Sequence, residues 1–161
     1  MRFSIQTHGC HPSDGSYCVT LSTHGQRKLL TSENPFALKG GLPVPTSIGS
    51  AVIAAWQALP QHFSHLATDA FYLMPDGICG LVSVGAGGTA SLRLLYRAVS
   101  AFKAETTRVY NLGSAQDYHS RLWQTAFRCD AIVAPAELDA LRQRMFAQGA
   151  YPVRRRLNNS Q

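Results

Sequence analysis

The chain has 161 residues, of which 45% are hydrophobic and 15% charged, and its formal net charge at pH 7 is +6. This composition excludes a disordered polyelectrolyte, and the sequence holds no run of about 18 apolar residues of the kind that crosses a bilayer. We expect one domain over residues 1–161, located in the cytoplasm and without a membrane partner, whose basic C-terminal tail is mobile from about residue 150.

Alternating polar and apolar residues predict strands near the N-terminus. Residues 2–6 and 16–22 both alternate, and the dipeptide His24-Gly25 has the composition of a hairpin turn. Residues 27–31 are therefore expected to return as the strand that pairs with 16–22. Three prolines and a glycine pair make residues 33–45 a predicted connector.

A helix is predicted to run to about Leu59. Thr46 or Ser47 supplies the oxygen of its N-cap, and Pro60 is expected to stop it because the ring interrupts the helical hydrogen bonds. Apolar residues recur at helical spacing and predict a buried stripe of Ile48, Val52, Trp56 and Leu59.

The centre of the chain predicts a hairpin followed by a long helix. Residues 71–74 and 78–84 are apolar runs of strand length, and Pro75-Asp76-Gly77 between them has the chemistry of a turn. A glycine-rich loop then lets the backbone reverse, and Thr89 or Ser91 caps the helix. Its predicted buried face is Leu92, Leu95, Val99 and Phe102.

The last third predicts a strand and two helices. Residues 108–112 look like a short strand, and Ser114 with Asp117 resembles a capping box that opens a helix to about Cys129. A final helix is expected over residues 135–149. The order of elements indicates an α+β fold, with a mainly antiparallel sheet of about five or six strands and three to four helices packed on it.

Basic residues form the first candidate site. Arg93 and Arg97 lie on the side of the central helix opposite its apolar stripe, and Lys103 lies at the border. Cations that contact phosphates release counterions, so such binding weakens with salt. The predicted contacts to nucleic acid or a partner are Arg93, Arg97, Lys103, Arg154, Arg155 and Arg156. The alternative interpretation is a solvated helix face and a soluble tail.

A cysteine nucleophile is the alternative from another class of function. Cys79 follows the turn at Asp76-Gly77, which is similar to the Asp-Gly-x-Cys turn of some cysteine proteases. A thiolate needs an imidazole base and a third group that orients the base, and His119 and Asp130 follow in a workable order. This hypothesis makes the protein a hydrolase, whereas a Cys79 buried in a strand would be a small hydrophobe.

No metal or cofactor is predicted. His8, Cys10 and His11 have suitable ligand atoms, but residues this close along the chain do not easily face one ion, and the turn formers around them explain the segment. The loop at residues 85–88 lacks the Gly-Lys-Ser/Thr ending of a phosphate-binding loop. The four cysteines lack zinc or redox spacing, so reduced thiols are expected.

Short segments between about residues 52 and 130 resemble ArdB/KlcA-type antirestriction proteins, which are non-enzymatic factors of plasmids and other mobile elements. The segments are residues 59–63 (Leu-Pro-Gln-His-Phe), the strand 71–75, the long helix after it, and residues 118–122 (Tyr-His-Ser-Arg-Leu). Here the Leu-Pro-x-His-Phe piece follows the Trp-bearing helix, whereas in the family it precedes that helix. The resemblance implies an accessory protein that acts without catalysis.

These observations together predict a small basic regulatory or accessory protein of a bacterial mobile element. We expect it to act by binding and not by catalysis. Its expected partner is nucleic acid or a nucleic-acid-processing protein.

Overall fold

The computed structural model describes residues 5–6, 15–32, 38–39, 42–85, 89–113 and 120–147. At its centre is a five-stranded sheet in the order β1-β7-β2-β6-β5. Its strands are β1 (Ile5–Gln6), β2 (Gly15–Ser22), β5 (Leu66–Met74), β6 (Gly77–Val84) and β7 (Phe127–Ile132). Neighbours are antiparallel except β1, which runs parallel to β7. The two-residue strands β3 (Leu38–Lys39) and β4 (Leu42–Pro43) pair separately.

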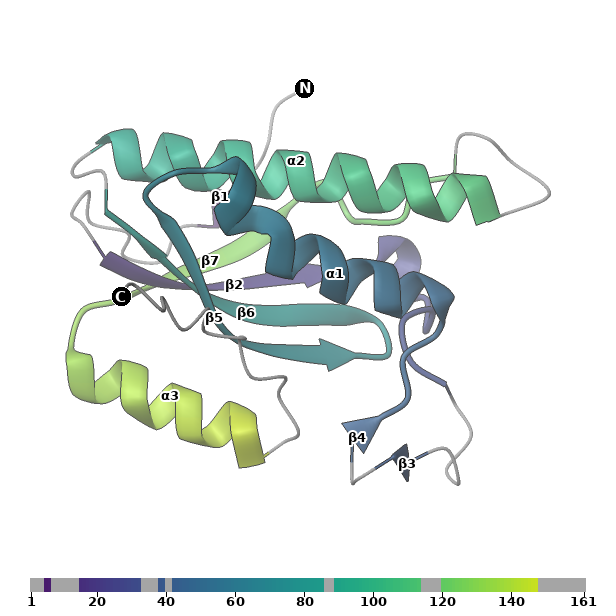
Figure 1. The fold of residues 1–161 in the computed structure, drawn as a ribbon, viewed down its shortest axis with the longest axis horizontal. Helices are drawn as coiled ribbons and strands as arrows, with labels where there is room; N and C mark the ends of the chain where they lie inside the picture. Colours follow the sequence, from purple (N-terminus) through teal and green to yellow (C-terminus); the bar gives the residue numbers. More distant parts are fainter. Residues whose placement is uncertain are drawn as a thin grey trace, which may run out of the picture.

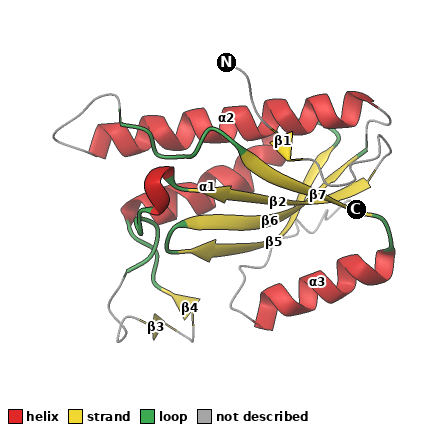
Figure 2. Ribbon diagram, turned by 180° about the vertical axis from the view of Figure 1, so that it is seen from behind, coloured by secondary structure: helices red, strands yellow, loops and turns green. Residues whose placement is uncertain are grey.

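Three helices cover the sheet from two sides (Figures 1 and 2). They are α1 (Ser47–His62), α2 (Thr89–Gly113) and α3 (Pro135–Ala147), and the short 3-10 helix η1 (His24–Gln26) follows β2. α1 packs on β5 and α2, and α2 also contacts β6, whereas α3 crosses the opposite face and contacts β5 and β7. The predicted α+β class, with a mainly antiparallel sheet, is confirmed. No helix in the described ranges is long and apolar enough to cross a membrane.

Strand alternation sends neighbouring side chains to different layers. Tyr17, Val19 and Leu21 of β2 are buried on the side that α1 and α2 cover, as predicted. Cys18 and Thr20 are half-buried and point to the α3 side.

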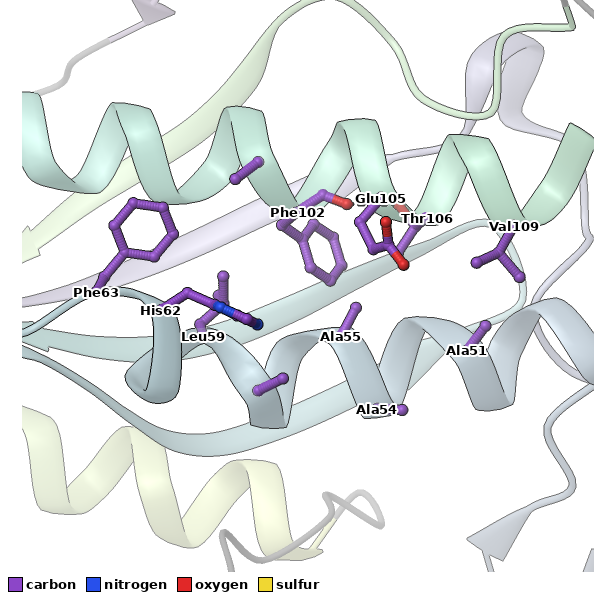
Figure 3. Close-up of a pocket in the computed structure, with 12 residues that line it drawn as sticks. Ala51, Ala54, Ala55, Leu59, His62, Phe63, Phe102, Glu105, Thr106 and Val109 are labelled. Atoms are coloured by element: carbon purple, nitrogen blue, oxygen red, sulfur yellow. Dashed lines mark hydrogen bonds between the residues drawn. The ribbon is translucent and has the colours of Figure 1, made fainter.

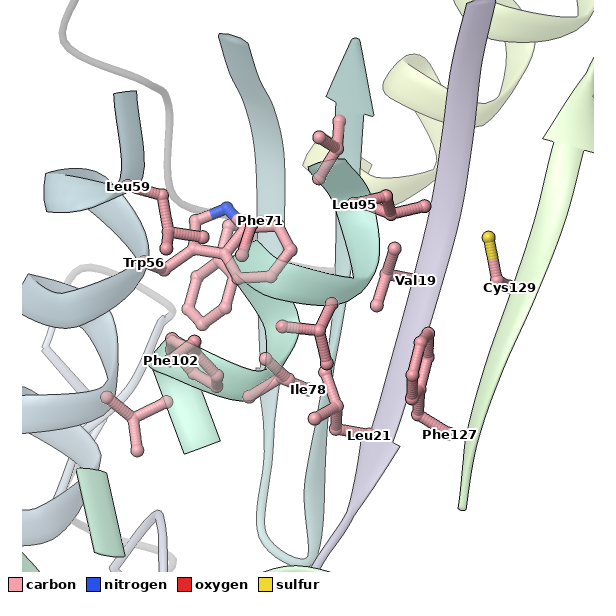
Figure 4. Close-up of a cluster of buried hydrophobic side chains, with 14 of the residues drawn as sticks. Val19, Leu21, Trp56, Leu59, Phe71, Ile78, Leu95, Phe102, Phe127 and Cys129 are labelled. Atoms are coloured by element: carbon pink, nitrogen blue, oxygen red, sulfur yellow. The ribbon is translucent and has the colours of Figure 1, made fainter. Parts of the chain in front are cut away.

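Trp56 lies in the middle of the core between α1, α2 and the sheet (Figure 4). Its ring centroid is 5.5 Å from that of Phe71 on β5 and 5.7 Å from that of Phe102 on α2, with the second pair edge to face at 89°. Such pairs add about 0.5–1.5 kcal/mol beyond burial. The stripes predicted for the two helices are confirmed as core, with Val52, Trp56, Leu59, Leu95, Val99 and Phe102 buried and Ile48 and Leu92 partly buried.

The predicted start of α1 is confirmed, and its predicted end is wrong. Thr46 is the N-cap, and its Oγ1 accepts a 3.1 Å hydrogen bond from the N–H of Gly49. The helix continues past Pro60 to His62. Proline lacks the N–H that would donate one helical hydrogen bond. Because only two helical residues follow Pro60, losing this bond costs the helix little stability.

Three further predicted elements are wrong. Residues 27–31 do not pair with β2, because the N–H groups of Leu29 and Leu30 donate to the carbonyl of Pro75, and β2 pairs with β6 and β7. Residues 108–112 belong to α2, and the helix expected from Ser114 to about Cys129 is wrong at its end, because β7 begins at Phe127.

Candidate functional site

The α3 side of the sheet is only partly covered. α3 seals one end of this face with an apolar cluster that contains Ala70, Leu81, Ile132, Leu138, Leu141 and Met145. Toward the β5–β6 turn no described helix packs on this face. Of the side chains there, Arg128 is exposed, and Thr20, Tyr72 and Cys79 are half-buried.

Four side chains form a row across this open part, which we call the sheet-face row: Arg128, Thr20, Cys79 and Tyr72. Thr20 of β2 lies opposite Arg128 of β7 and Cys79 of β6, and Cys79 lies opposite Tyr72 of β5. Side chains in such register are about 4.5–5.5 Å apart at Cβ and share a face. The row therefore brings a guanidinium, a hydroxyl, a thiol and a phenol together from four strands.

Cys79 has a second thiol beside it. Cys18 lies two residues before Thr20 on the same face of β2, and its Sγ is 3.3 Å from the Sγ of Cys79. The hydrogen bond from Cys18 lowers the pKa of Cys79 to about 7 against the effect of burial, and Thr20 and Arg128 also lower this pKa. The same hydrogen bond raises the pKa of Cys18. Loss of a proton from the pair is therefore easier at Cys79 than at Cys18.

Two charged groups of β7 lie beside the thiol pair. Asp130 lies directly opposite Cys18, and its carboxylate raises the pKa of both cysteines. Its Oδ2 accepts a 2.7 Å hydrogen bond from Nε of Arg128, and Arg128 lowers the pKa of Cys79. Arg128 therefore favours a thiolate on Cys79, whereas Asp130 opposes a thiolate on either cysteine.

The residues of the predicted hydrolase are only partly placed. Cys79 and Asp130 lie on one face of the sheet, but His119 is outside the described residues, so the catalytic set stays a prediction. Sequence analysis missed Cys18 as a neighbour of Cys79, because that contact depends on the register of β2 against β6. The sequence offered one sign of this contact, since the alternation in residues 16–22 places Cys18 and Thr20 on the same face of the strand.

Arg93 and Arg97 are exposed on α2, as predicted. They are four residues apart and so share a helix face. Within the described part of the chain, neither forms an ion pair with an acidic side chain. This pair is available to an anionic partner.

Lys103 lies in a different environment. It is half-buried, and its Nζ donates hydrogen bonds of 2.8 Å to the carbonyl of Gln124 and 3.1 Å to that of Thr125. Burial lowers the pKa of Lys103 to about 8. Its amine ties α2 to the segment before β7 with two of its three N–H groups.

Three other described arginines are tied to acidic side chains. Arg108 pairs with Glu105, Arg128 with Asp130, and Arg142 with both Asp69 and Asp139. Arg142 lies on α3, across the sheet from α2. Residues 154–156 lie outside the described ranges, so the part of the prediction that rests on Arg154, Arg155 and Arg156 stays a prediction.

A groove of about 730 Å³ lies along the line where α1 and α2 meet (Figure 3). Small side chains such as Ala51, Ala55 and Ala101 leave this space, and His62 and Glu105 are polar groups in its lining. It offers hydrophobic contact but few polar atoms that would orient a ligand.

Within the described ranges, no three His, Cys, Asp or Glu side chains gather closely enough to hold a metal ion. The segment with His8, Cys10 and His11 lies outside those ranges.

The fold is similar to solved structures of transposases. A REP-associated tyrosine transposase bound to a REP hairpin superposes with a TM-score of 0.55 at 12% identity, over 86% of this chain and 68% of that chain. A transposase candidate from Deinococcus radiodurans R1 gives a TM-score of 0.49 at 12% identity, over 92% of this chain and 98% of that chain. No protein-family model and no curated protein matches the sequence. The chain therefore shares its fold with the REP-associated transposase.

The resemblance to ArdB/KlcA-type antirestriction proteins is wrong. The fold is similar to that of a REP-associated tyrosine transposase, and no family model or curated protein supports the antirestriction family. The segments behind the resemblance were short: residues 59–63 are the end of α1 and the bend after it, and residues 71–75 are the end of β5 and the start of a turn. Segments of five residues at the end of a helix or a strand are too short to identify a family.

Proposed function

We propose that this protein binds nucleic acid, in particular a folded hairpin, as an accessory or regulatory component of a mobile element. The main support is the similarity, over 86% of the chain, to a transposase whose solved structure holds a REP hairpin. The formal net charge of +6 is consistent with an anionic partner.

Arg93 and Arg97 are the described residues that we propose contact phosphates. They are four residues apart, which is about 6 Å along the helix axis, and both are exposed. Neither charge is offset by a described carboxylate. We keep Arg154, Arg155 and Arg156 in the proposed interface on the strength of the sequence. Lys103 stays at its border, with two of its three N–H groups already donating to carbonyls.

Fluorescence anisotropy of the full chain with a labelled DNA hairpin, repeated over a series of salt concentrations, tests the proposal. Phosphate contacts predict a linear fall of log affinity with log salt, at about 0.9 per contact for duplex DNA. We expect tighter binding to the hairpin than to an unpaired strand of the same composition. No binding even at low salt would contradict the proposal, and equal affinity for both oligonucleotides would remove the preference for hairpins.

A further inference from the structure

The Cys18 and Cys79 thiols are held close together by the sheet itself. They are diagonal neighbours on adjacent strands, since Cys18 lies opposite Leu81 and Cys79 lies opposite Thr20, and their Sγ atoms are 3.3 Å apart. A disulfide needs about 2.0 Å, so the sulfurs must approach by roughly 1.3 Å. Both side chains are half-buried at the edge of the cluster under α3. A small oxidant can therefore reach them.

We propose that Cys18 and Cys79 form a redox-active dithiol site, which a hydroperoxide oxidises to an intramolecular disulfide that joins β2 to β6. Cys79 is the attacking thiol, because Arg128 and the hydroxyl of Thr20 favour its thiolate. Cys18 is the resolving thiol, because its hydrogen bond to Cys79 and its burial disfavour its ionisation, and the carboxylate of Asp130 opposite it adds to this effect. The two cysteines thus have different roles, fixed by their neighbours in the sheet.

The reaction proceeds in two balanced steps. The thiolate of Cys79 attacks the terminal oxygen of a hydroperoxide, ROOH, and the O–O bond breaks; with one proton taken up, the products are a sulfenic acid on Cys79 and the alcohol ROH. The thiol of Cys18 then attacks the sulfur of Cys79, which forms the S–S bond and releases the hydroxyl with the proton of Cys18 as water. Overall, two thiols and ROOH give a disulfide, ROH and water. A dithiol reductant reverses the modification.

Cys129 provides an internal control. It lies opposite Val19 in β7 and is buried, 3% exposed, on the side of the sheet that α2 covers. It is therefore separated from the pair by the sheet itself. The inference does not depend on the proposed nucleic-acid binding.

The test treats the reduced full chain with hydrogen peroxide, blocks the remaining thiols with an alkylating agent, and maps disulfides by mass spectrometry without reduction. Trypsin followed by a protease that cuts before aspartate separates Cys10 from Cys18 at Asp14. We expect a cross-linked peptide pair that contains Cys18 and Cys79 and that disappears on addition of dithiothreitol.

Variants separate the two roles. C79S is expected to slow the peroxide-dependent loss of the Cys18 thiol at least about tenfold, because a thiol with an ordinary pKa is only a few per cent ionised at neutral pH. C18S is expected to stop at the sulfenic acid of Cys79, which dimedone traps, and C129S is expected to behave as the wild type.

Three results would overturn the proposal. They are a disulfide that involves Cys10 or Cys129 in place of the pair, thiols at both Cys18 and Cys79 that remain alkylatable after peroxide, and C79S reacting at the wild-type rate. The mapping uses the wild-type chain, so it decides the question even if a variant folds poorly.

Discussion

The indole of Trp56 rests on the backbone of Gly80. A Cβ added at position 80 would come within 2.2 Å of Cζ2 of Trp56, and the ring cannot move away because it is 1% exposed between Phe71 and Phe102. The indole of α1 can lie this close to the backbone of β6 because residue 80 has no side chain.

Gly80→Ala is expected to lower the free energy of unfolding by about 1–3 kcal/mol, as overpacking does in other cores. Urea denaturation measures the change. Gly113→Ala is the matched control, because a Cβ there meets nothing within 4 Å. In a Trp56→Phe background the penalty of Gly80→Ala should shrink, and an undiminished penalty would contradict the assigned contact.

The buried pair of Thr106 and Trp123 supports the C-terminal half of α2. Nε1–H of Trp123 donates a 2.8 Å hydrogen bond to Oγ1 of Thr106, whose hydroxyl donates in turn to the carbonyl of Phe102. Thr106→Val keeps the shape but removes the acceptor, so we expect a loss of about 1–3 kcal/mol in the free energy of unfolding. With Trp123→Phe already present, the loss should be smaller, and additive penalties would argue against this hydrogen bond.

The amine of Lys103 predicts a pH dependence of stability. Its folded pKa, lowered to about 8 by burial, lies below the unfolded value of about 10.4. Between these values the unfolded chain binds more protons, so the contribution of Lys103 to stability rises as the pH increases from about 8 to about 10.4. The difference in unfolding free energy between the wild type and Lys103→Met isolates this group, and a difference that is constant across the window would contradict the assignment.

Alkylation measures the thiolate of Cys79. Because its pKa is lowered to about 7, the rate of its reaction with iodoacetamide should rise with pH around a midpoint near 7, whereas an ordinary thiol has a midpoint near about 8.5. Peptide mapping resolves Cys79 from the buried Cys129, which should stay protected until unfolding. A Cys79 that reacts only in the unfolded chain would contradict both this assignment and the hydrolase alternative.

Elements whose determinants lie close along the sequence were predictable. The cap at Thr46, the turn at Pro75-Asp76-Gly77 and the apolar stripes of α1 and α2 all follow from local spacing. α2 was predicted too short because its continuation through Thr106 depends on Trp123, a residue 17 positions away. β7 was missed for a similar reason, since its place in the sheet comes from pairing with the distant β2.

The candidate sites divide in the same way. The spacing of Arg93 and Arg97 is a property of one helix, so their common exposed face was predictable. The contact between the thiols of Cys18 and Cys79 joins residues 61 positions apart. It can be predicted only when the register of β2 against β6 is known. The capture of Lys103 by two carbonyls likewise requires the fold.

The salt dependence of hairpin binding by the double variant R93A/R97A tests the central claim most directly. Loss of two phosphate contacts should weaken binding and reduce the slope of log affinity against log salt by about 2. The control R128A/R144A removes the same charge from an arginine of β7 that is paired with Asp130 and from an exposed arginine on α3. We predict that the control keeps most of the wild-type slope, and equal slopes for the two double variants would contradict a binding surface on α2.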